Sequence, residues 1–134
     1  MVDMDKQYLL DTKACISLIK NVGDVRQRII NVGIANCFVS SITIPELYYG
    51  AAKSNRPEHY QDVVLVKDHF GVISIDDSLN EYGLVKTKLE RKGTPIDDFD
   101  LLIGCTALHA GMTIVTHNAK HISRIPNIRI EDWE

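Results

Sequence analysis

The sequence predicts an α/β protein in which helices cover both faces of a parallel sheet. Along the 134 residues, short apolar runs alternate with longer stretches of helical periodicity. Such runs are typical of strands buried on both faces, because a strand with one face in water would alternate apolar and polar residues. The runs lie at 8–10, 37–41, 72–75, 113–116 and 128–130, and the helical patterns at 12–30, 43–53, 57–69, 77–92 and 98–110.

The first two strands are each followed by a helix with an acidic residue near its start. Asp11 ends the first apolar run and opens the helical pattern at 12–30. In the pattern at 43–53, Glu46 lies beside the apolar stripe, on the face of Gly50 and Lys53, where the helix dipole favours a first-turn carboxylate. The stripe itself consists of Ile44, Leu47, Tyr48 and Ala51 at i, i+3, i+4 and i+7.

A break separates the last two long helices. Gly93 ends the 77–92 pattern, and Pro95 prevents it from resuming. Asp97 or Asp98 is then expected to cap the helix that contains Asp100. The basic residues of the preceding helix form either a solvated face or a surface that follows a phosphate backbone. They are Lys86, Lys88, Arg91 and Lys92.

Composition predicts one globular domain over residues 1–134, in the cytoplasm. The chain is 45% hydrophobic and 25% charged, and its net charge of −3 gives no general attraction to nucleic acid. Three widely spaced cysteines indicate buried, reduced thiols. The charged segment 1–6 is not a secretory signal, and no apolar run is long enough for a membrane span.

The acidic residues Asp11, Glu46 and Asp100 are the candidate functional residues. All three follow changes of element, and ligands of open α/β sheets bind at the carboxyl ends of the strands. A divalent cation would relieve the repulsion between converging carboxylates, and oxygen-only ligands suit Mg²⁺ or Mn²⁺ and phosphodiester cleavage. Each alone could instead be a helix cap or dipole partner, and a zinc pair of His117 and His121 is an alternative.

Four stretches of the chain, in order, carry a family resemblance. They are residues 8–12, 40–50, 93–104 and 114–118, followed by a tail at 129–133. With these stretches the sequence resembles the PIN-domain family, particularly the VapC-like toxins of bacterial type II toxin–antitoxin pairs. The resemblance implies a three-layer α/β/α sandwich on a mainly parallel five-stranded sheet.

The resemblance also implies a function and roles for single residues. It implies an Mg²⁺- or Mn²⁺-dependent endoribonuclease that hydrolyses a translation-related RNA, is silenced by a VapB-like antitoxin, and forms a homodimer within a larger complex. Asp11, Glu46 and Asp100 are then catalytic, with Asp11 and Asp100 as metal ligands. The residues expected to support them or bind substrate are Thr12, Thr116 and Asn118.

The chain departs from the family pattern near the expected site. Lys13 stands where an asparagine is common, Asn118 where an acidic residue is common, and His121 and Ile122 where an acidic and an aromatic residue occur in relatives. Without metal, the Lys13 ammonium is expected to pair with the carboxylates; the alternative is a lysine that points into solvent from the first turn of the helix.

Two other functions remain open at this stage. One is a non-catalytic PIN scaffold that binds RNA or a protein, and the other is a phosphoacceptor domain, which also gathers carboxylates at strand ends. The stretch 43–70 resembles the family's helical clip. Its aromatic residues are either core or a docking surface for a second protomer or an antitoxin, and they are Tyr48, Tyr49, Tyr60 and Phe70.

Overall fold

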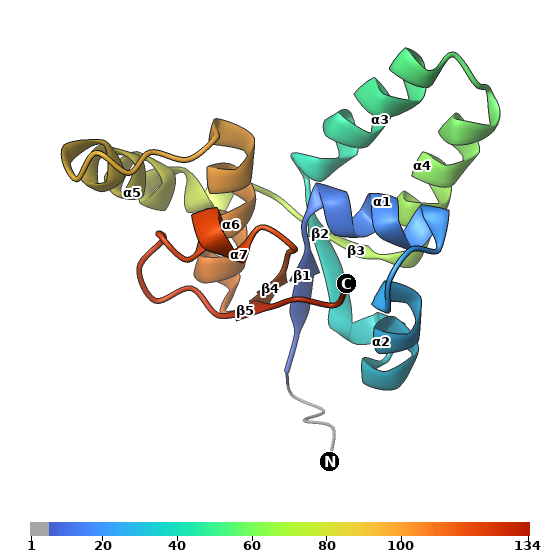
Figure 1. Ribbon diagram of the computed structural model, residues 1–134, viewed down its shortest axis with the longest axis horizontal. Helices are drawn as coiled ribbons and strands as arrows, with labels where there is room; N and C mark the ends of the chain where they lie inside the picture. Colours follow the sequence, from blue (N-terminus) through green and yellow to red (C-terminus); the bar gives the residue numbers. More distant parts are fainter. Residues whose placement is uncertain (1–5) are drawn as a thin grey trace.

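The computed structural model describes residues 6–134 and is built on a five-stranded sheet (Figure 1). The strand order is β3-β2-β1-β4-β5, and every pairing is parallel. This arrangement confirms the predicted fold class. Residues 1–5, which form most of the segment judged not to be a secretory signal, lie outside the described part. The strands are β1 (Tyr8–Leu10), β2 (Cys37–Ser40), β3 (Gly71–Ile73), β4 (Thr113–Val115) and β5 (Ile130–Glu131).

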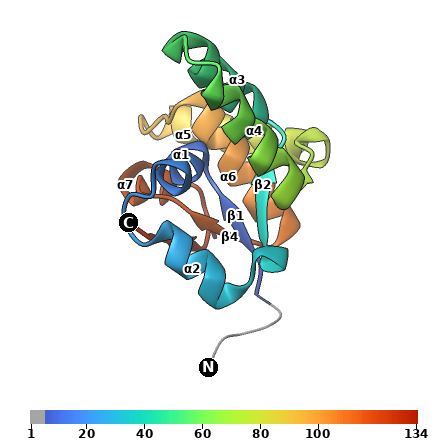
Figure 2. The same cartoon turned by 90° about the vertical axis from the view of Figure 1, so that its right-hand side faces the viewer.

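Helices lie on both sides of the sheet (Figures 1 and 2). One side carries α1 (Thr12–Lys20), α2 (Val25–Val32), α3 (Thr43–Ser54) and α4 (Glu58–His69). The other side carries α5 (Leu79–Arg91), α6 (Asp98–Ala110) and α7 (Ala119–Ile122). Two short 3₁₀ helices cover Ile34–Asn36 and Asp76–Ser78. Within residues 6–134, none of the helices is both long and apolar enough to cross a membrane.

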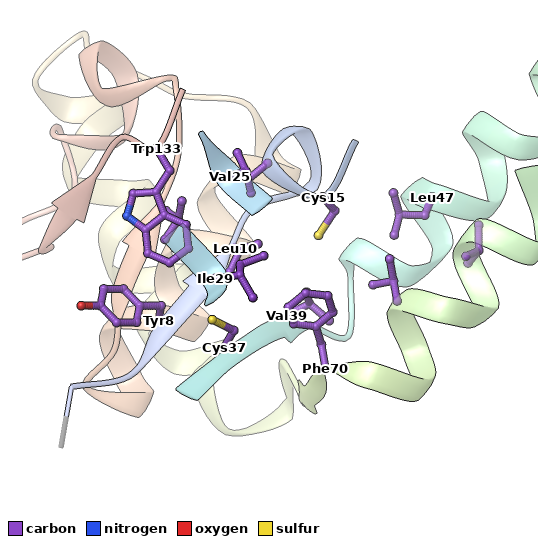
Figure 3. Packing of buried hydrophobic residues seen from close by; sticks show 14 of the residues in the cluster. Tyr8, Leu10, Cys15, Val25, Ile29, Cys37, Val39, Leu47, Phe70 and Trp133 are labelled. Atoms are coloured by element: carbon purple, nitrogen blue, oxygen red, sulfur yellow. The ribbon is translucent and has the colours of Figure 1, made fainter. Parts of the chain in front are cut away.

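Alternation along β1 divides the core between the two sides. Tyr8 and Leu10 face the α1–α4 side, whereas Leu9 packs with Ile103 and Ile114 on the α6 side. The centroid of the Tyr8 ring lies 5.1 Å from that of Trp133, and both rings belong to the core on the α1–α4 side (Figure 3). Both faces of β1 are therefore covered, as its continuous apolar run predicts.

The single helix predicted at 12–30 is wrong, because two helices occupy this stretch. Asn21 ends α1 in the left-handed conformation at φ 54°, and Gly23 follows at φ 66°. A Cβ on Gly23 would also lie 3.0 Å from the Glu134 Cα, so the turn needs glycine both for its backbone and for its packing. The fifth strand also differs from its predicted range of 128–130, since pairing with β4 is confined to Ile130 and Glu131.

The predicted clip is a helical hairpin of α3 and α4 that extends beyond the sheet (Figure 1). Its aromatic residues divide between core and surface. Phe70 is buried, and the Tyr48 and Tyr60 rings lie 6.5 Å apart across the hairpin. Tyr49 is instead 68% exposed, so it contributes little to the core.

The strand order places a topological switch point between β1 and β4. The chain leaves β1 toward β2 on one side and reaches β4 on the other, so the connections diverge at the carboxyl ends of these two strands. In open α/β sheets such a point forms a crevice in which ligands bind. Asp11 and Thr116 directly follow the two strands.

Candidate active site

Asp11 is fixed at the carboxyl end of β1 by hydrogen bonds to β4 and α1. Its backbone N–H donates to the Val115 carbonyl at 3.0 Å, which continues the β1–β4 ladder. Its side-chain Oδ1 accepts from the Ala14 N–H at 2.7 Å and so caps α1. The Thr116 hydroxyl lies near this carboxylate and lowers its pKa. Asp11 is only 6% exposed, so both its structural role and its position are rigidly defined.

Glu46 approaches the same region from the first turn of α3. The Thr12 Oγ1 donates to Glu46 Oε1 at 2.6 Å, which links α1 to α3. The Thr43 hydroxyl lies 3.1 Å from that of Thr12 and extends the link into the buried base of α3. Glu46 is half-buried, and the helix places it beside the apolar stripe as the sequence indicates.

Asp100 lies in the first turn of α6 on the opposite side of the sheet. Asp97 caps this helix, because its Oδ2 accepts from the N–H groups of Phe99 at 3.1 Å and Asp100 at 3.3 Å. The Asn118 side chain lies near the Asp100 carboxylate and lowers its pKa. His121 Nδ1 lies 2.7 Å from Asn118 Oδ1, so the imidazole must donate this bond, and the Asn118 amide is left facing Asp100.

The three carboxylates line one pocket of about 600 Å³. Thr12 and Lys13 line the same pocket from α1, and Tyr49 and Phe99 line it from α3 and α6. The structure thus brings Asp11, Glu46 and Asp100 together from segments that are far apart in the chain. Each of the predicted supporting residues contacts a different member of this trio, as described above.

Burial and repulsion from neighbouring carboxylates raise the pKa of all three carboxyl groups. Burial is the largest cause in each case, and the Asp100 charge raises the pKa of Asp11 and of Glu46. Asp97 adds to the effect on Glu46 and Asp100. The hydroxyl and amide partners act in the opposite direction, but they do not restore the ordinary pKa.

These properties fit a hard divalent cation. The donor set is made of carboxylate, hydroxyl and amide oxygens, which suit Mg²⁺ or Mn²⁺ better than softer metals. Raised carboxyl pKa values mean that the folded chain lacks positive charge at this point, and a cation would supply it. Asp11 and Asp100 come from the two sides of the switch point and can serve as its ligands.

Lys13 does not take the place of such a cation. Its charge lowers the pKa of Asp11 and Asp100, and its side chain lines the pocket. Within residues 6–134, however, no ion pair shorter than 4 Å joins Lys13 to a carboxylate, contrary to the prediction. Lys13 is exposed in the first turn of α1, where water competes with a carboxylate for its ammonium.

The predicted alternatives around His117 also differ from the structure. His117 precedes α7, so it does not share a helical face with His121 as a zinc pair would. Its Nδ1 lies 2.9 Å from Asp132 Oδ2 instead.

Two other expectations can also be compared with the structure. Ile122 is buried in the core beside Ile114, which explains an aliphatic residue at this position. On the basic helix, Lys86 is engaged by Asp98 at 2.8 Å.

Three residues at the site were not assigned to it from the sequence. His121 orients Asn118, but this link depends on the short helix α7, which no periodicity predicted. Tyr49 was assigned only to the core or to a docking surface, and Phe99 was not singled out. Their positions three residues after Glu46 and directly before Asp100 are the signals that could have identified them.

The fold and this pocket together define a class of α/β proteins that gather carboxylates at the switch point of a parallel sheet, as hard-metal hydrolases do. Comparison with known proteins specifies the class further. The PIN domain family model matches residues 8–128. The tRNA(fMet)-specific endonuclease VapC of Salmonella typhimurium is 37% identical over 132 residues, with 95% of this chain and 98% of that protein covered. Ribonuclease VapC2 of Rickettsia felis is 34% identical, with the same coverage.

Solved structures give the same result. A chain of VapBC2 from Rickettsia felis, bound to a DNA fragment from its promoter, matches with a TM-score of 0.86 at 32% identity, covering 95% of this chain and 98% of that one. A chain of DNA-bound VapBC from Salmonella typhimurium has a TM-score of 0.83 at 32% identity, with 96% and 99% covered. This chain belongs to the PIN-domain family, among the VapC ribonucleases.

Proposed function

We propose that this protein is an Mg²⁺- or Mn²⁺-dependent endoribonuclease that acts as the toxin of a toxin–antitoxin pair, in one PIN-like domain over residues 1–134. The observation that carries the proposal is the convergence of three carboxylates, from segments far apart in the chain, in one pocket. Glu46 and Asp100 cap no helix, so helix capping does not account for their places in the pocket. Membership of the VapC ribonucleases adds independent support.

In this proposal, Asp11 and Asp100 are the ligands of the cation, and Glu46 is the general base. Bound Mg²⁺ or Mn²⁺ would supply positive charge that acidifies a water and offsets the charge gathering on the phosphate. Glu46 accepts the proton of the attacking water, and its raised pKa makes it a better base than an ordinary carboxylate. Thr12 orients Glu46 through the 2.6 Å bond, and Asn118 orients Asp100.

We extend the same proposal to substrate and partners. The substrate is a translation-related RNA, and tRNA(fMet), named for the Salmonella relative, is the first to test. The antitoxin is a VapB-like protein, as in the related VapBC complexes, and the toxin forms a homodimer in the cytoplasm. A groove of about 530 Å³ between α1, α2 and α4 offers an apolar contact surface, since Ile30 and Leu65 line it while 65% and 54% exposed.

The test is RNA cleavage by the purified protein with controlled metal content. Cleavage should stop in excess EDTA and return with Mg²⁺ or Mn²⁺, and Asp11→Asn or Asp100→Asn should abolish it. Attack by water leaves a 5′-phosphate and a 3′-hydroxyl, whereas attack by the RNA's own 2′-hydroxyl leaves a cyclic phosphate. Undiminished cleavage in EDTA, or a 2′,3′-cyclic end, would contradict the proposed mechanism.

The toxin assignment has a separate test. Expression of the chain alone should arrest growth of a bacterial host, and co-expression of the protein encoded beside it should restore growth. The Asp100→Asn variant, expressed at the same level, should be harmless. RNA that is bound but left intact under every metal condition would favour the non-catalytic PIN module instead.

A further inference from the structure

Two large aromatic side chains are exposed at the mouth of the acidic pocket. Tyr49 is 68% exposed and Phe99 is 47% exposed, and both line the pocket that contains the carboxylates. Tyr49 belongs to α3 and Phe99 to α6, so the rings come from the two sides of the sheet. Within residues 6–134, neither ring packs against another aromatic ring. Their apolar area therefore contributes little to the core.

One face of α3 carries, in order along the helix, an acidic residue, an aromatic residue, a glycine and a basic residue. Glu46, Tyr49, Gly50 and Lys53 recur at i, i+3, i+4 and i+7, so they lie along one face of the helix. Glu46 lies at the end of this face where the other two carboxylates line the pocket. The Lys53 Nζ lies 5.9 Å from the centroid of the Tyr49 ring. A Cβ built on Gly50 would meet nothing within 4 Å, so the space beside Tyr49 is open.

On the facing side, the start of α6 fixes Phe99. Its backbone N–H donates to Asp97 Oδ2 at 3.1 Å, and the next residue is Asp100. The ring is thus attached to a capped helix end directly beside a proposed metal ligand. A flat ring on a rigid element can offer its face to a ligand with little loss of conformational freedom.

We propose that Tyr49 and Phe99 stack on the unpaired bases to either side of the phosphate that reaches the carboxylates, and so position the strand for cleavage. The inference rests on the proposed ribonuclease function and adds to it two substrate-binding residues. Unpaired bases can turn their faces to aromatic side chains, whereas bases in a duplex are covered by their neighbours. Lys53, beside Tyr49, contacts the phosphate that follows the stacked base.

Charge favours stacking over electrostatic attraction at this site. The chain has a net charge of −3, and the floor of the pocket is acidic, so the protein cannot hold a polyanion by a basic surface alone. Stacking of one base on an aromatic ring contributes about 1–3 kcal/mol and does not depend on sequence. Two such rings can position a strand that the carboxylates would otherwise repel.

The test measures binding separately from cleavage. A short fluorescent single-stranded RNA is titrated, by anisotropy, into protein that carries Asp100→Asn and therefore leaves the RNA intact. Tyr49→Ala and Phe99→Ala should each weaken binding by about 5- to 100-fold, which corresponds to the stacking of one base. Tyr49→Phe should retain full affinity, because stacking needs the ring and not the hydroxyl.

Two further measurements distinguish stacking from other roles. The factor lost in each alanine variant should be the same at low and high salt, since stacking is not screened. In protein with Asp100 intact, the same substitutions should raise KM more than they lower kcat. Tyr60→Ala serves as the matched control, because Tyr60 is 43% exposed on α4 but does not line the pocket, and it should leave RNA affinity unchanged.

The outcomes separate this inference from the proposed function. If no RNA is cut by the unaltered protein, the nuclease proposal fails, while the binding titration still tests the two rings. If the unaltered protein cuts RNA but both alanine variants bind single strands as it does, the stacking inference is overturned. Equal RNA affinity together with loss of binding to a partner protein would assign this aromatic surface to that partner.

Discussion

Single residues at the pocket show how the chain balances negative charge without neutralising it. Uncharged hydroxyl and amide groups beside Asp11, Glu46 and Asp100 lower the pKa values of these residues without supplying positive charge. The places of Thr12 and Thr116 could be predicted, because residues within two positions of the ends of β1 and β4 lie at the carboxyl edge of the sheet. The contact of His121 with Asn118 could not, because it depends on how a four-residue helix turns.

Asp100→Asn is expected to stabilise the metal-free protein while it removes function. Burial, and then repulsion by Asp97, raise the pKa of Asp100, so a neutral amide should be tolerated better at this position, and a gain of about 1 kcal/mol would raise Tm by roughly 2–4 °C. The melting temperature should be measured in EDTA and in Mn²⁺, and the rise caused by Mn²⁺ should shrink in the variant. Asp98→Asn is the control, because Asp98 pairs with Lys86 and should give no rise. Equal losses of Tm in both variants would contradict this account.

Lys13→Asn should strengthen cation binding to a small extent. The Lys13 charge lowers the pKa of Asp11 and Asp100, so the same positive charge also opposes the binding of a cation to these two carboxylates. Because Lys13 is exposed and forms no short ion pair with these residues, the gain in Mn²⁺ affinity should be less than about fivefold, as for exposed charge pairs. Calorimetric titration with Mn²⁺ measures it, and the gain should fade as salt is added. A tenfold or larger gain would mean that Lys13 enters the pocket in solution.

Among helices and strands, the sequence predicted periodic elements well and turns poorly. The strand at 8–10 and the helices near 43–53, 57–69 and 98–110 have nearly the predicted bounds, because burial imposes their apolar pattern. The break between α1 and α2 was missed, although Asn21 and Gly23 are residues that adopt positive φ readily. Gly23 also packs against Glu134, which is far away in the sequence, and no local pattern carries that information.

Two glycines in helices should respond to alanine in opposite ways. A Cβ on Gly104 in α6 would collide with the side chain of Ile125, which is fully buried, so Gly104→Ala should cost about 1–3 kcal/mol of unfolding free energy. A Cβ on Gly83 in α5 would meet nothing within 4 Å, so Gly83→Ala should add about 0.5–1 kcal/mol through helix propensity. Urea unfolding of the two variants measures both signs. Stabilisation by Gly104→Ala would mean that α6 and Ile125 pack less tightly than described.

For the whole molecule, the three carboxylates predict how stability depends on pH. Their pKa values are raised on folding, so the folded chain binds more protons than the unfolded chain above the ordinary carboxyl range. Their contribution to stability is greatest at low pH and is lost as pH rises through the folded-state pKa values. Cations compete with these protons for the same oxygens. The gap between Tm in Mn²⁺ and in EDTA should therefore widen from about pH 4 to about pH 7, and a gap that does not change with pH would contradict the shared site.

The sequence predicted the fold class but not the order of the strands in the sheet. Alternating strand and helix patterns indicate parallel strands, but the position of β1 between β2 and β4 depends on long-range pairing, such as that of Leu10 with both Val39 and Val115. The residues of the site also divide into those that the sequence indicated and those that only the three-dimensional arrangement revealed. Asp11 and Glu46 could be selected from their places after strands and Asp100 from the family resemblance, whereas the rings of Tyr49 and Phe99 gained a role only when α3 and α6 were placed on opposite sides of one pocket.

The central place of β1 also governs when the pocket exists during synthesis of the chain. Asp11 is made first, but its strand has one open edge until Thr113–Val115 pairs with it, and Thr116 and Asn118 emerge later still. A ribosome that has made only the first hundred or so residues therefore carries a chain with no assembled pocket. Prematurely ended chains should be harmless for the same reason. A protein that attacks the translation machinery would thus become dangerous only near the end of its own translation, when a partner made beside it can already be present.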